Sequence, residues 1–399
     1  MSTNKVNKEV WIIGAKRTPF GALGGCLKSI SAIDLGVAAS KASIAQAEIR
    51  AEDVDQTVLG NVQQTSPDAI YGGRHVALKA GVPIDRTAIT VNRLCGSGFQ
   101  ALITAAEQIL LGESNCVLAA GAENMSQAPH AVWGLRDASK LGRPPQLVDT
   151  LWESLTDSYC NTSMAVTAEN VAEYYEITRE ESDAFALESQ RRWARADQAG
   201  QFDEQIVPLE VRMGRNTVTF DRDEHPRPET TGEALARLPA LFKEGGIVTA
   251  GNASGISDGA AALVVADRDW AVKRGLRPLA KVVQWGVVGV EPKLMGIGPV
   301  PAIRKVLDRA GRKLADVDLF DINEAFASQF LAVQKELGLS RDKTNIRGGA
   351  IALGHPLGAT GTRIIADLIY ALRQTDKRIG VGAACIGGGQ GIAVLIEGC

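Results

Sequence analysis

The chain has 399 residues, of which 45% are hydrophobic and 22% charged, and its formal net charge is −3. This composition is typical of a globular protein, and the length predicts two or three domains or one large α/β body. Because there is no basic excess, non-specific binding to nucleic acid is excluded and no nucleic-acid partner is expected.

Six cysteines are scattered along the chain without a Cys-x-x-Cys pair. This spacing argues against a structural zinc site and against a disulfide framework. We therefore expect no metal, a reducing compartment and a cytoplasmic location. We find no signal or transit peptide and no apolar run long enough to span a membrane.

Buried strands alternate with helices in the first part of the chain, and glycine-rich turns separate them, as in α/β folds. Apolar runs predict strands, and apolar residues at helical spacing predict helices. The strands are expected at 10–15, 56–62, 88–91 and 116–123, and the helices at 32–47 and from Ser97 onward.

The composition changes between residues 124 and 248. This stretch holds irregular Pro- and Gly-marked segments, one charged amphipathic helix and the polar loop FDRDEHPRPETTGEAL. We interpret 124–248 as an inserted loop domain that covers a substrate. The α/β body then consists of an N-terminal half, residues 1–123 and 249–273, and a C-terminal half, residues 274–399.

The C-terminal half repeats the order of elements. The segments KASIAQAEIRAEDVDQTVLGNV and RKVLDRAGRKLADVDLFDINEA share a helix, an Asp-Val-Asp and a buried strand. Asp53 and Asp316 are then equivalent, which predicts an internal duplication. Strands are expected at 279–290, 318–323, 378–385 and 391–397, and helices at 301–311, 324–337 and 360–372.

Cys95 lies in VNRLCGSGFQALITAAEQIL, where an apolar strand ends and a helical pattern begins. A cysteine at a helix N-terminus has its thiolate stabilised by the helix dipole, which lowers its pKa. Gly96 and Gly98 allow a tight turn with room for a substrate, as in the nucleophile elbow of hydrolases. Taken alone, a buried structural cysteine explains Cys95 at least as well as a nucleophile does.

One of the four histidines has a setting suited to proton transfer. His355 lies in GGAIALGHPLGATG, a glycine-rich loop that enters a helix. A neutral imidazole there can accept a proton from a thiol, although a loop-capping role also explains it. His75, His130 and His225 are assigned structural or surface roles.

Two further polar residues end strands beside turns. Cys385 begins CIGGGQG, whose glycines can expose backbone N–H groups to an oxyanion, although a plain hairpin also explains the glycines. Asn323 begins NEAFA and either caps the next helix or orients a water in an oxyanion site. Ligand sites of parallel sheets gather at the carboxyl ends of strands. We therefore expect one covalent site built from Cys95, His355, Cys385 and Asn323.

These segments resemble the signature blocks of the thiolase family. NRLCGSGFQA, GNASGISDGAAA, NEAFA, GGAIALGHPLGATG and CIGGGQGIA occur in the family's order, and the resemblance runs from AKRTPFGALGG to the C-terminus. It implies a duplicated, five-layered αβαβα fold of the α/β class with an inserted loop domain. It also implies CoA-dependent thiolytic cleavage of a 3-ketoacyl-CoA to acetyl-CoA and a shortened acyl-CoA, and the reverse Claisen condensation.

The resemblance implies a role for each residue of the site. Cys95 takes the acyl group as a thioester, His355 deprotonates Cys95 or the CoA thiol, and Cys385 exchanges the proton at the α-carbon. One oxyanion hole uses His355 and a water held by Asn323, and the other uses the N–H groups of Cys95 and Gly387. Coenzyme A and acyl-CoA are substrates without a permanently bound cofactor, and the protein is a homo-oligomer, a tetramer or a dimer.

By the same resemblance, CoA lies on the insertion against Arg227 and Thr230 of EHPRPET and Ser254 of GNASG. An arginine suits a phosphate or the adenine face, although a solvated loop charge also explains Arg227. Two positions depart from the family pattern. Ser163 begins Ser-Met-Ala where short-chain biosynthetic thiolases carry His-Met-Gly, and Arg347 of NIRGG stands where an Asn is usual.

Three alternatives remain open. The segments AENMSQAPH, LWESLTDSY and DEHPRPETT favour a degradative 3-ketoacyl-CoA thiolase for short and medium chains over a dedicated biosynthetic acetoacetyl-CoA thiolase. A related condensing enzyme, such as a ketoacyl synthase, would have a Cys-His-His or Cys-His-Asn site. The cysteine in CIGGG argues against this alternative. A non-catalytic acyl-CoA-binding protein would form no acyl-enzyme at Cys95.

Overall fold

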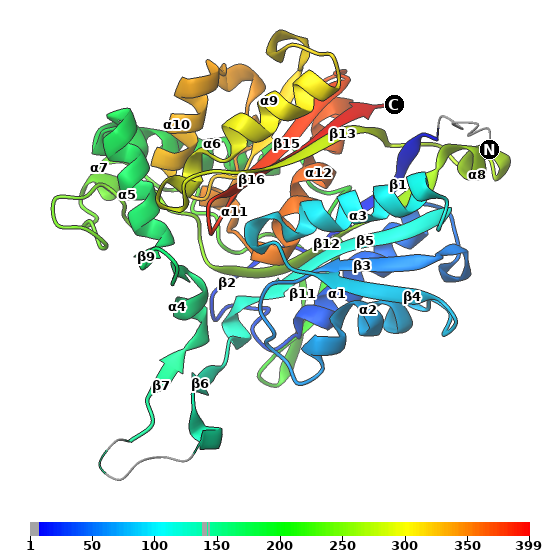
Figure 1. The fold of residues 1–399 in the computed structure, drawn as a ribbon, viewed down its shortest axis with the longest axis horizontal. Helices are drawn as coiled ribbons and strands as arrows, with labels where there is room; N and C mark the ends of the chain where they lie inside the picture. The colour runs from blue at the N-terminus through cyan, green and yellow to red at the C-terminus, as the bar shows by residue number, and fades with distance from the viewer. Residues whose placement is uncertain (1–7, 138–141, 143) are drawn as a thin grey trace.

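A computed structural model describes residues 8–137, 142 and 144–399 of the chain. Its main strands are β1 (Val10–Arg17), β3 (Gln56–Gly60), β4 (Thr87–Val91), β5 (Cys116–Asn124), β12 (Ser257–Asp267), β13 (Ala280–Gly289), β14 (Leu319–Ile322), β15 (Ile379–Ile386) and β16 (Gln390–Gly398). The helices around them are α1 (Ala32–Gln46), α2 (Gly72–Ala80), α3 (Ser97–Leu111), α9 (Pro299–Arg309), α10 (Ala327–Leu337) and α12 (Leu357–Gln374). The strands form one mixed sheet in the order β14-β15-β16-β13-β1-β12-β5-β3-β4, and β2 (Gly21–Ala22) pairs with β12 (Figure 1).

The helices form three layers around the two halves of this sheet (Figure 1). The helices α3 and α12 pack against each other and contact strands of both halves, so they form the central layer. The helices α1 and α2 cover the outer face of the N-terminal strands, and α9 and α10 cover that of the C-terminal strands. Three hydrophobic core clusters fill the four interfaces between sheet and helices, since one of them covers both faces of the central helix layer. The expected five-layered αβαβα fold is confirmed.

Two matching local structures confirm the internal duplication. The carboxylates of Asp53 and Asp316 each accept a hydrogen bond from the backbone N–H three residues earlier, at 3.0 and 2.7 Å. Two residues further on, the carboxylates of Asp55 and Asp318 accept from the first N–H of β5 and of β15, at 3.2 and 2.9 Å. The chain then enters β3 and β14, which pair in parallel with β5 and β15.

The segment between β5 and β12 contains small hairpins, helices and irregular stretches. The expected amphipathic helix is α6 (Arg179–Gln198), whose N-cap Thr178 and Glu181 form a capping box. Helix α5 (Met164–Tyr175) precedes it, and the hairpin of β10 (Leu209–Met213) and β11 (Asn216–Phe220) follows it. The boundaries of the insertion at residues 124 and 248 stay predictions.

The region around NEAFA corrects two expectations. The helix expected from Glu324 begins at Ala327, and its N-cap is Phe326 rather than Asn323. The reason lies in the buried carboxylate of Glu324, which accepts hydrogen bonds from Ser189 Oγ and Asn345 Nδ2 at 2.6 and 3.0 Å. These contacts hold the segment before α10 in a non-helical path.

One stretch also corrects the expectation that no apolar run reaches membrane-spanning length. In the described part of the chain, Leu94–Leu111 is long and apolar enough to cross a membrane by length and composition alone. In the fold, 56% of this stretch is buried, and it forms α3 and the turn before it. Such a profile is typical of a core helix.

Candidate active site

Cys95 lies at a strained turn between β4 and α3. It belongs to the short 3-10 helix Leu94–Gly96, and Leu94 adopts the left-handed conformation with φ 46°. Asn92 Oδ1 accepts the Leu94 N–H at 2.9 Å, and Ser97 Oγ donates to the Leu94 carbonyl at 2.7 Å. A non-glycine residue in this conformation stores strain that surrounding contacts must hold, as in a nucleophile elbow.

The Cys95 thiol is protonated at neutral pH, which corrects the lowered pKa expected from the helix dipole. Burial raises the pKa of Cys95 to about 11, although the N–H groups of Gly387 and of Cys95 itself favour the thiolate. The loss of hydration outweighs the two N–H groups. The structure thus places the Gly387 N–H beside the Cys95 sulfur, where a negative charge would develop.

His355 stands in the same pocket, held by contacts on both ring nitrogens. Its Nδ1 lies 2.6 Å from Thr360 Oγ1, and the Thr360 hydroxyl lies 3.1 Å from the Pro356 carbonyl oxygen. Its Nε2 lies 3.3 Å from the side-chain amide of Asn323. Because the Thr360 hydroxyl donates to the Pro356 carbonyl, it accepts from Nδ1, and Nε2 keeps its lone pair.

The His355 imidazole is neutral. Burial, helped by the positive charge of Arg363, lowers the pKa of His355 to about 3. A neutral imidazole beside a neutral thiol fits proton transfer that accompanies the attack rather than a standing ion pair. Asn323 is fully buried, and its Oδ1 has no hydrogen-bond partner among the described residues. Such an orphan acceptor fits an ordered water.

Cys385 is the last residue but one of β15, and Ile386 separates it from the glycine turn. It is fully buried in a cluster with Met295 and Ala325 and with the partly buried Met164 and Phe326. Burial, and the nearby sulfur of Cys95, raise the pKa of the Cys385 thiol. In the turn after Ile386, Gly388 and Gly389 both have positive φ, so the turn requires glycine there. Cys385 is therefore a neutral thiol packed against residues that line the pocket of Cys95.

The pocket has a volume of about 160 Å³ and a mostly apolar wall. Ser254 lines it together with Cys95 and His355, and its N–H donates to the Ala325 carbonyl at 3.0 Å. Arg227 and Thr230 lie outside this lining, on a turn closed by the Thr230 hydroxyl and the Arg227 carbonyl at 2.7 Å. Within the described ranges, no group of three or more His, Cys, Asp or Glu residues is placed to hold a metal.

The sequence reading missed Glu123, a buried carboxylate that joins the two halves behind the pocket. It accepts the N–H groups of Val62 and Gln63, at 3.1 and 3.0 Å, and that of Gly358 in the first turn of α12, at 2.9 Å. Burial raises its pKa to about 7 in spite of these bonds. The signal that could have found it is a carboxylate at the end of the otherwise apolar strand CVLAAGAE.

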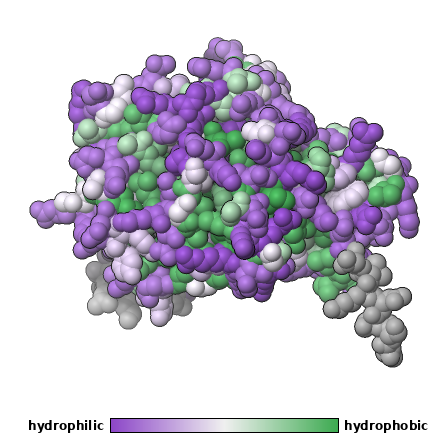
Figure 2. Space-filling model, turned by 90° about the horizontal axis from the view of Figure 1, so that it is seen from above, coloured by the Kyte–Doolittle hydropathy of each residue, from purple (hydrophilic) through white to green (hydrophobic). Residues whose placement is uncertain are grey.

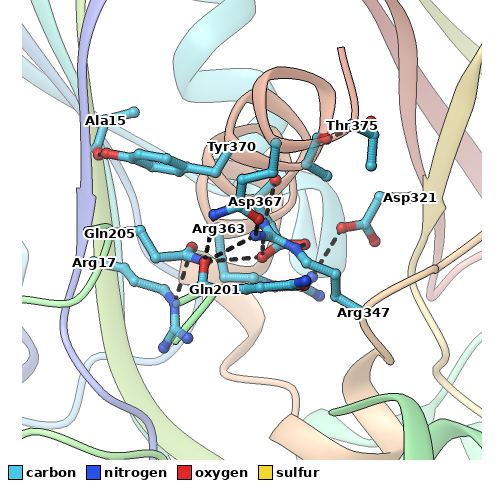
Figure 3. A network of polar contacts seen from close by, with 12 residues as sticks. Ala15, Arg17, Gln201, Gln205, Asp321, Arg347, Arg363, Asp367, Tyr370 and Thr375 are labelled. Atoms are coloured by element: carbon cyan, nitrogen blue, oxygen red, sulfur yellow. Dashed lines mark hydrogen bonds and ion pairs between the residues drawn. The ribbon is translucent and has the colours of Figure 1, made fainter. Parts of the chain in front are cut away.

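The two departures from the family pattern have local explanations. Ser163 lines the pocket and caps α5, since its Oγ accepts the Val166 N–H at 3.3 Å. Arg347 is buried, does not line the pocket and belongs to a polar network with Asp367 (Figure 3). The segment before His355 is instead held by Asn345, whose side chain binds the backbone of Ile322 at 2.8 and 2.9 Å.

Comparisons with known proteins give a consistent picture. The family models of the thiolase N-terminal and C-terminal domains match residues 10–269 and 276–398. The mitochondrial 3-ketoacyl-CoA thiolase of Bos taurus is 51% identical over 388 residues, covering 97% of this chain and 98% of that protein. Beta-ketothiolase BktB of Cupriavidus necator is 46% identical over 393 residues, covering 98% of this chain and all of that protein. A crystal structure of human mitochondrial 3-ketoacyl-CoA thiolase in complex with CoA superposes with a TM-score of 0.96, at 50% identity and 98% coverage of both chains.

The same comparisons contradict the expected cytoplasmic location. The bovine and human relatives are both named as mitochondrial enzymes. The expectation rested on unpaired cysteines, which indicate a reducing environment. More than one compartment provides such an environment, so cysteine usage cannot distinguish between them.

Replacement of Thr360 by Val should lower the kcat/KM for thiolysis about ten- to hundredfold. The change leaves the buried His355 Nδ1–H without an acceptor, which costs about 1–3 kcal/mol and frees the ring to change tautomer. Steady-state kinetics with acetoacetyl-CoA measure the effect. Thr360→Ser should stay close to wild type. Thr362→Val, on the same helix and hydrogen-bonded only to its own helix, is the matched control. Equal losses in Thr360→Val and Thr362→Val would contradict the role of Thr360.

Proposed function

The chain belongs to the thiolase family, and from that premise we propose that Cys95, His355 and Cys385 transfer an acyl group through an acyl-cysteine. The enzyme is an acyltransferase that acts on CoA thioesters in thiolytic cleavage and in the reverse Claisen condensation. The observation that carries the assignment of residues is an apolar pocket lined by the Cys95 thiol and a neutral His355 imidazole, with the Cys385 thiol packed against residues of its wall. A binding protein has no need of such a set, and nothing favours a second function.

In the cleavage direction, Cys95 attacks the 3-keto carbon while His355 Nε2 takes the thiol proton. The tetrahedral intermediate collapses by breaking the bond between the α- and β-carbons, and the electron pair passes to the acetyl-CoA enolate. Cys385 gives a proton to that α-carbon, acetyl-CoA leaves, and the proton that His355 took from Cys95 passes to the Cys385 thiolate, so the imidazole is neutral again. His355 then deprotonates the CoA thiol, and the CoA thiolate attacks the acyl-Cys95 thioester. The intermediate collapses by breaking the bond to the Cys95 sulfur, which takes the proton back from His355 as the shortened acyl-CoA leaves.

Two oxyanions form in this sequence, and two sets of donors suit them. The N–H groups of Cys95 and Gly387 face the sulfur side of the pocket, as their effect on the Cys95 pKa indicates. His355 and a water on Asn323 supply the second set, which the unpartnered Oδ1 of Asn323 supports. Preorganised donors of this kind are worth about 3–4 kcal/mol each in the transition state.

We further propose that CoA enters over the insertion, residues 124–248. Ser254 faces the part of the ligand nearest the reacting thioester, because it lines the pocket beside Cys95 and His355. Arg227 and Thr230 face the nucleotide end, since their turn lies beyond the pocket lining and Arg227 is exposed. A guanidinium is the side chain best suited to a phosphate.

We propose the degradative subtype, with short and medium acyl chains as substrates. The pocket wall supports it, because Trp152, Leu155, Phe242 and Phe326 offer apolar area beyond what an acetyl group needs. Trp152 and Phe242 stack with ring centroids 6.4 Å apart, and 52% of the Trp152 side chain is exposed. An alkyl tail can lie against them. The alternative is a dedicated biosynthetic acetoacetyl-CoA thiolase.

We propose that the protein is a homo-oligomer, a dimer or a tetramer. Strand β4 ends the strand order, so one of its edges has no partner within the described chain, and Ile89 on it is 45% exposed. Ile84 and Leu111 are 82% and 73% exposed. The upper face of the molecule, seen in Figure 2, also carries hydrophobic residues between hydrophilic ones. Such an edge favours pairing with a second copy. Sedimentation velocity should give a dimer or tetramer, and a monomer at micromolar concentration would refute the proposal.

Cys385→Ala should lose thiolysis of acetoacetyl-CoA by a factor on the order of 10³, because no other group is placed to protonate the α-carbon. The same variant should still exchange labelled CoA into acetyl-CoA, since that exchange uses only Cys95 and His355 and breaks no carbon–carbon bond. Cys116→Ala, at a fully buried cysteine of β5, is the control. Near-normal thiolysis in Cys385→Ala would remove the role assigned to Cys385.

A series of 3-ketoacyl-CoA substrates tests the subtype. Each methylene that the pocket wall buries contributes about 0.8 kcal/mol, or about fourfold in kcat/KM. We expect kcat/KM to rise from acetoacetyl-CoA to 3-ketohexanoyl-CoA and to stay high for 3-ketooctanoyl-CoA. A maximum at acetoacetyl-CoA followed by a steep fall would instead support the biosynthetic alternative.

A further inference from the structure

A continuous chain of buried polar contacts joins the insertion to both halves of the body (Figure 3). We call it the anchor chain, and its five members are each at most 6% exposed. Asp223 and Gln205 belong to the insertion, Arg17 to β1, Asp367 to α12 and Arg347 to the segment before His355. Two arginines and two aspartates balance, so the chain buries no net charge.

Arg17 is the centre of this chain. Its guanidinium binds Asp223 in a bidentate pair, with Nη1–Oδ1 and Nη2–Oδ2 distances of 2.6 and 2.9 Å. Its Nε donates to Gln205 Oε1 at 3.2 Å, and the Phe20 N–H adds a bond to Asp223 Oδ1 at 2.8 Å. A charged, bidentate and fully buried pair is among the most directional contacts available to a protein.

The chain continues from Gln205 to the C-terminal half. Gln205 Nε2 donates to Asp367 Oδ1 at 3.0 Å, and Arg347 Nε donates to Asp367 Oδ2 at 3.3 Å. Burial opposes the charge of Asp367, but Arg347 and Arg363 outweigh it and hold its pKa below the usual value. Phe202 lies between the guanidiniums of Arg17 and Arg347, 5.6 and 5.2 Å from its ring centroid. These contacts fix the part of the insertion that follows α6.

The segment that the anchor chain ends on, residues 223–230, carries Arg227 and Thr230. Three of its side chains bind the body. Asp223 binds Arg17, the Glu224 carboxylate accepts the N–H groups of Ala22 and Cys26 at 2.9 and 3.0 Å, and His225 Nδ1 lies 2.8 Å from the Ala352 carbonyl. Within the insertion, the Arg227 N–H donates to Gln190 Oε1 at 2.9 Å. Asp223 is the most deeply buried of these contacts within the segment, since the residues from 224 onward are exposed or half-buried.

We propose that the anchor chain positions residues 223–230 for the nucleotide end of CoA, with Arg17 and Asp223 as the positioning pair. The proposal rests on the function proposed above. An exposed turn held in its bound geometry loses less conformational entropy on binding, so the anchor favours CoA affinity without touching the reacting atoms. The proposal also explains why an arginine stands at position 347, where the family usually has an asparagine, because Arg347 supplies the positive charge that balances Asp367.

The test compares two substrates that differ only at the nucleotide end, acetoacetyl-CoA and acetoacetyl-pantetheine, each with wild type and Asp223→Asn. The substitution keeps the shape of the side chain but removes the charge that orders Arg17. We expect kcat/KM for the CoA thioester to fall about tenfold, mainly through KM, while that for the pantetheine thioester changes less than about twofold.

Two further variants separate positioning from stability. Asp321→Asn breaks another buried pair in the same region, that of Asp321 with Arg363 at 3.2 Å, neither of which hydrogen-bonds through its side chain to a described residue of the insertion. It should affect both thioesters equally. Gln205→Met breaks both contacts of Gln205 without leaving a charge unpaired, and it should reproduce the CoA-selective loss in weaker form. If Asp223→Asn does not fold, the result for Gln205→Met tests the proposal in its place.

Equal losses for both thioesters in Asp223→Asn, or no loss for either, would overturn the proposal. Failure of the proposed function is distinguishable, because wild type would then turn over neither thioester. In that case calorimetry measures the affinity of wild type and of Asp223→Asn for CoA alone. Unchanged CoA affinity in Asp223→Asn would overturn the anchor role.

Discussion

The close approach of α3 and α12 is the contact on which the site depends. Where these helices begin, their backbones touch, and a Cβ on Gly361 would lie 2.0 Å from the Phe99 nitrogen. A Cβ on Gly98 would lie 2.6 Å from the Thr362 nitrogen. Cys95 precedes one helix and His355 precedes the other. The absence of side chains at this crossing therefore brings together two reactive groups that are 260 residues apart, as 355 minus 95.

Bringing Cys95 and His355 together buries two ionisable groups whose charged forms are stabilised by water. The pKa of Cys95 is raised to about 11 and that of His355 is lowered to about 3, in each case mainly by burial. Both groups are consequently neutral between these values, and the site holds no ion pair in the absence of substrate. Charge arises only during the attack, where the N–H groups of Cys95 and Gly387 are already in place. Glu123 stabilises this arrangement, since its carboxylate joins the first turn of α12 to the N-terminal half through a hydrogen bond.

Much of the fold could be predicted from the sequence because its signals are local. Periodicity placed most strands and helices, and Asp-Val-Asp in two similar contexts indicated the duplication. The turn at Cys95 followed from a strand pattern that changes to a helical one. The start of α10 could not be predicted, because it depends on contacts of Glu324 with Ser189 and Asn345.

Features that depend on contacts between residues far apart in the chain could not be predicted from the sequence. Thr360 and Glu123 act through hydrogen bonds whose partners are set by the tertiary structure. The direction of the Cys95 pKa was wrong because the helix dipole is visible in the sequence and the depth of burial is not. The cause of the departure at Arg347 became visible only when Asp367 was found beside it.

The central claim is that Cys95 carries the acyl group. Peptide mass spectrometry after brief incubation with acetyl-CoA and rapid acid quenching tests it directly. We expect acetyl on the peptide that contains Cys95, removed again by added CoA, and none on that peptide in Cys95→Ser. An unmodified Cys95 peptide in an enzyme that turns over, or acetyl carried on Cys385 instead, would contradict the account.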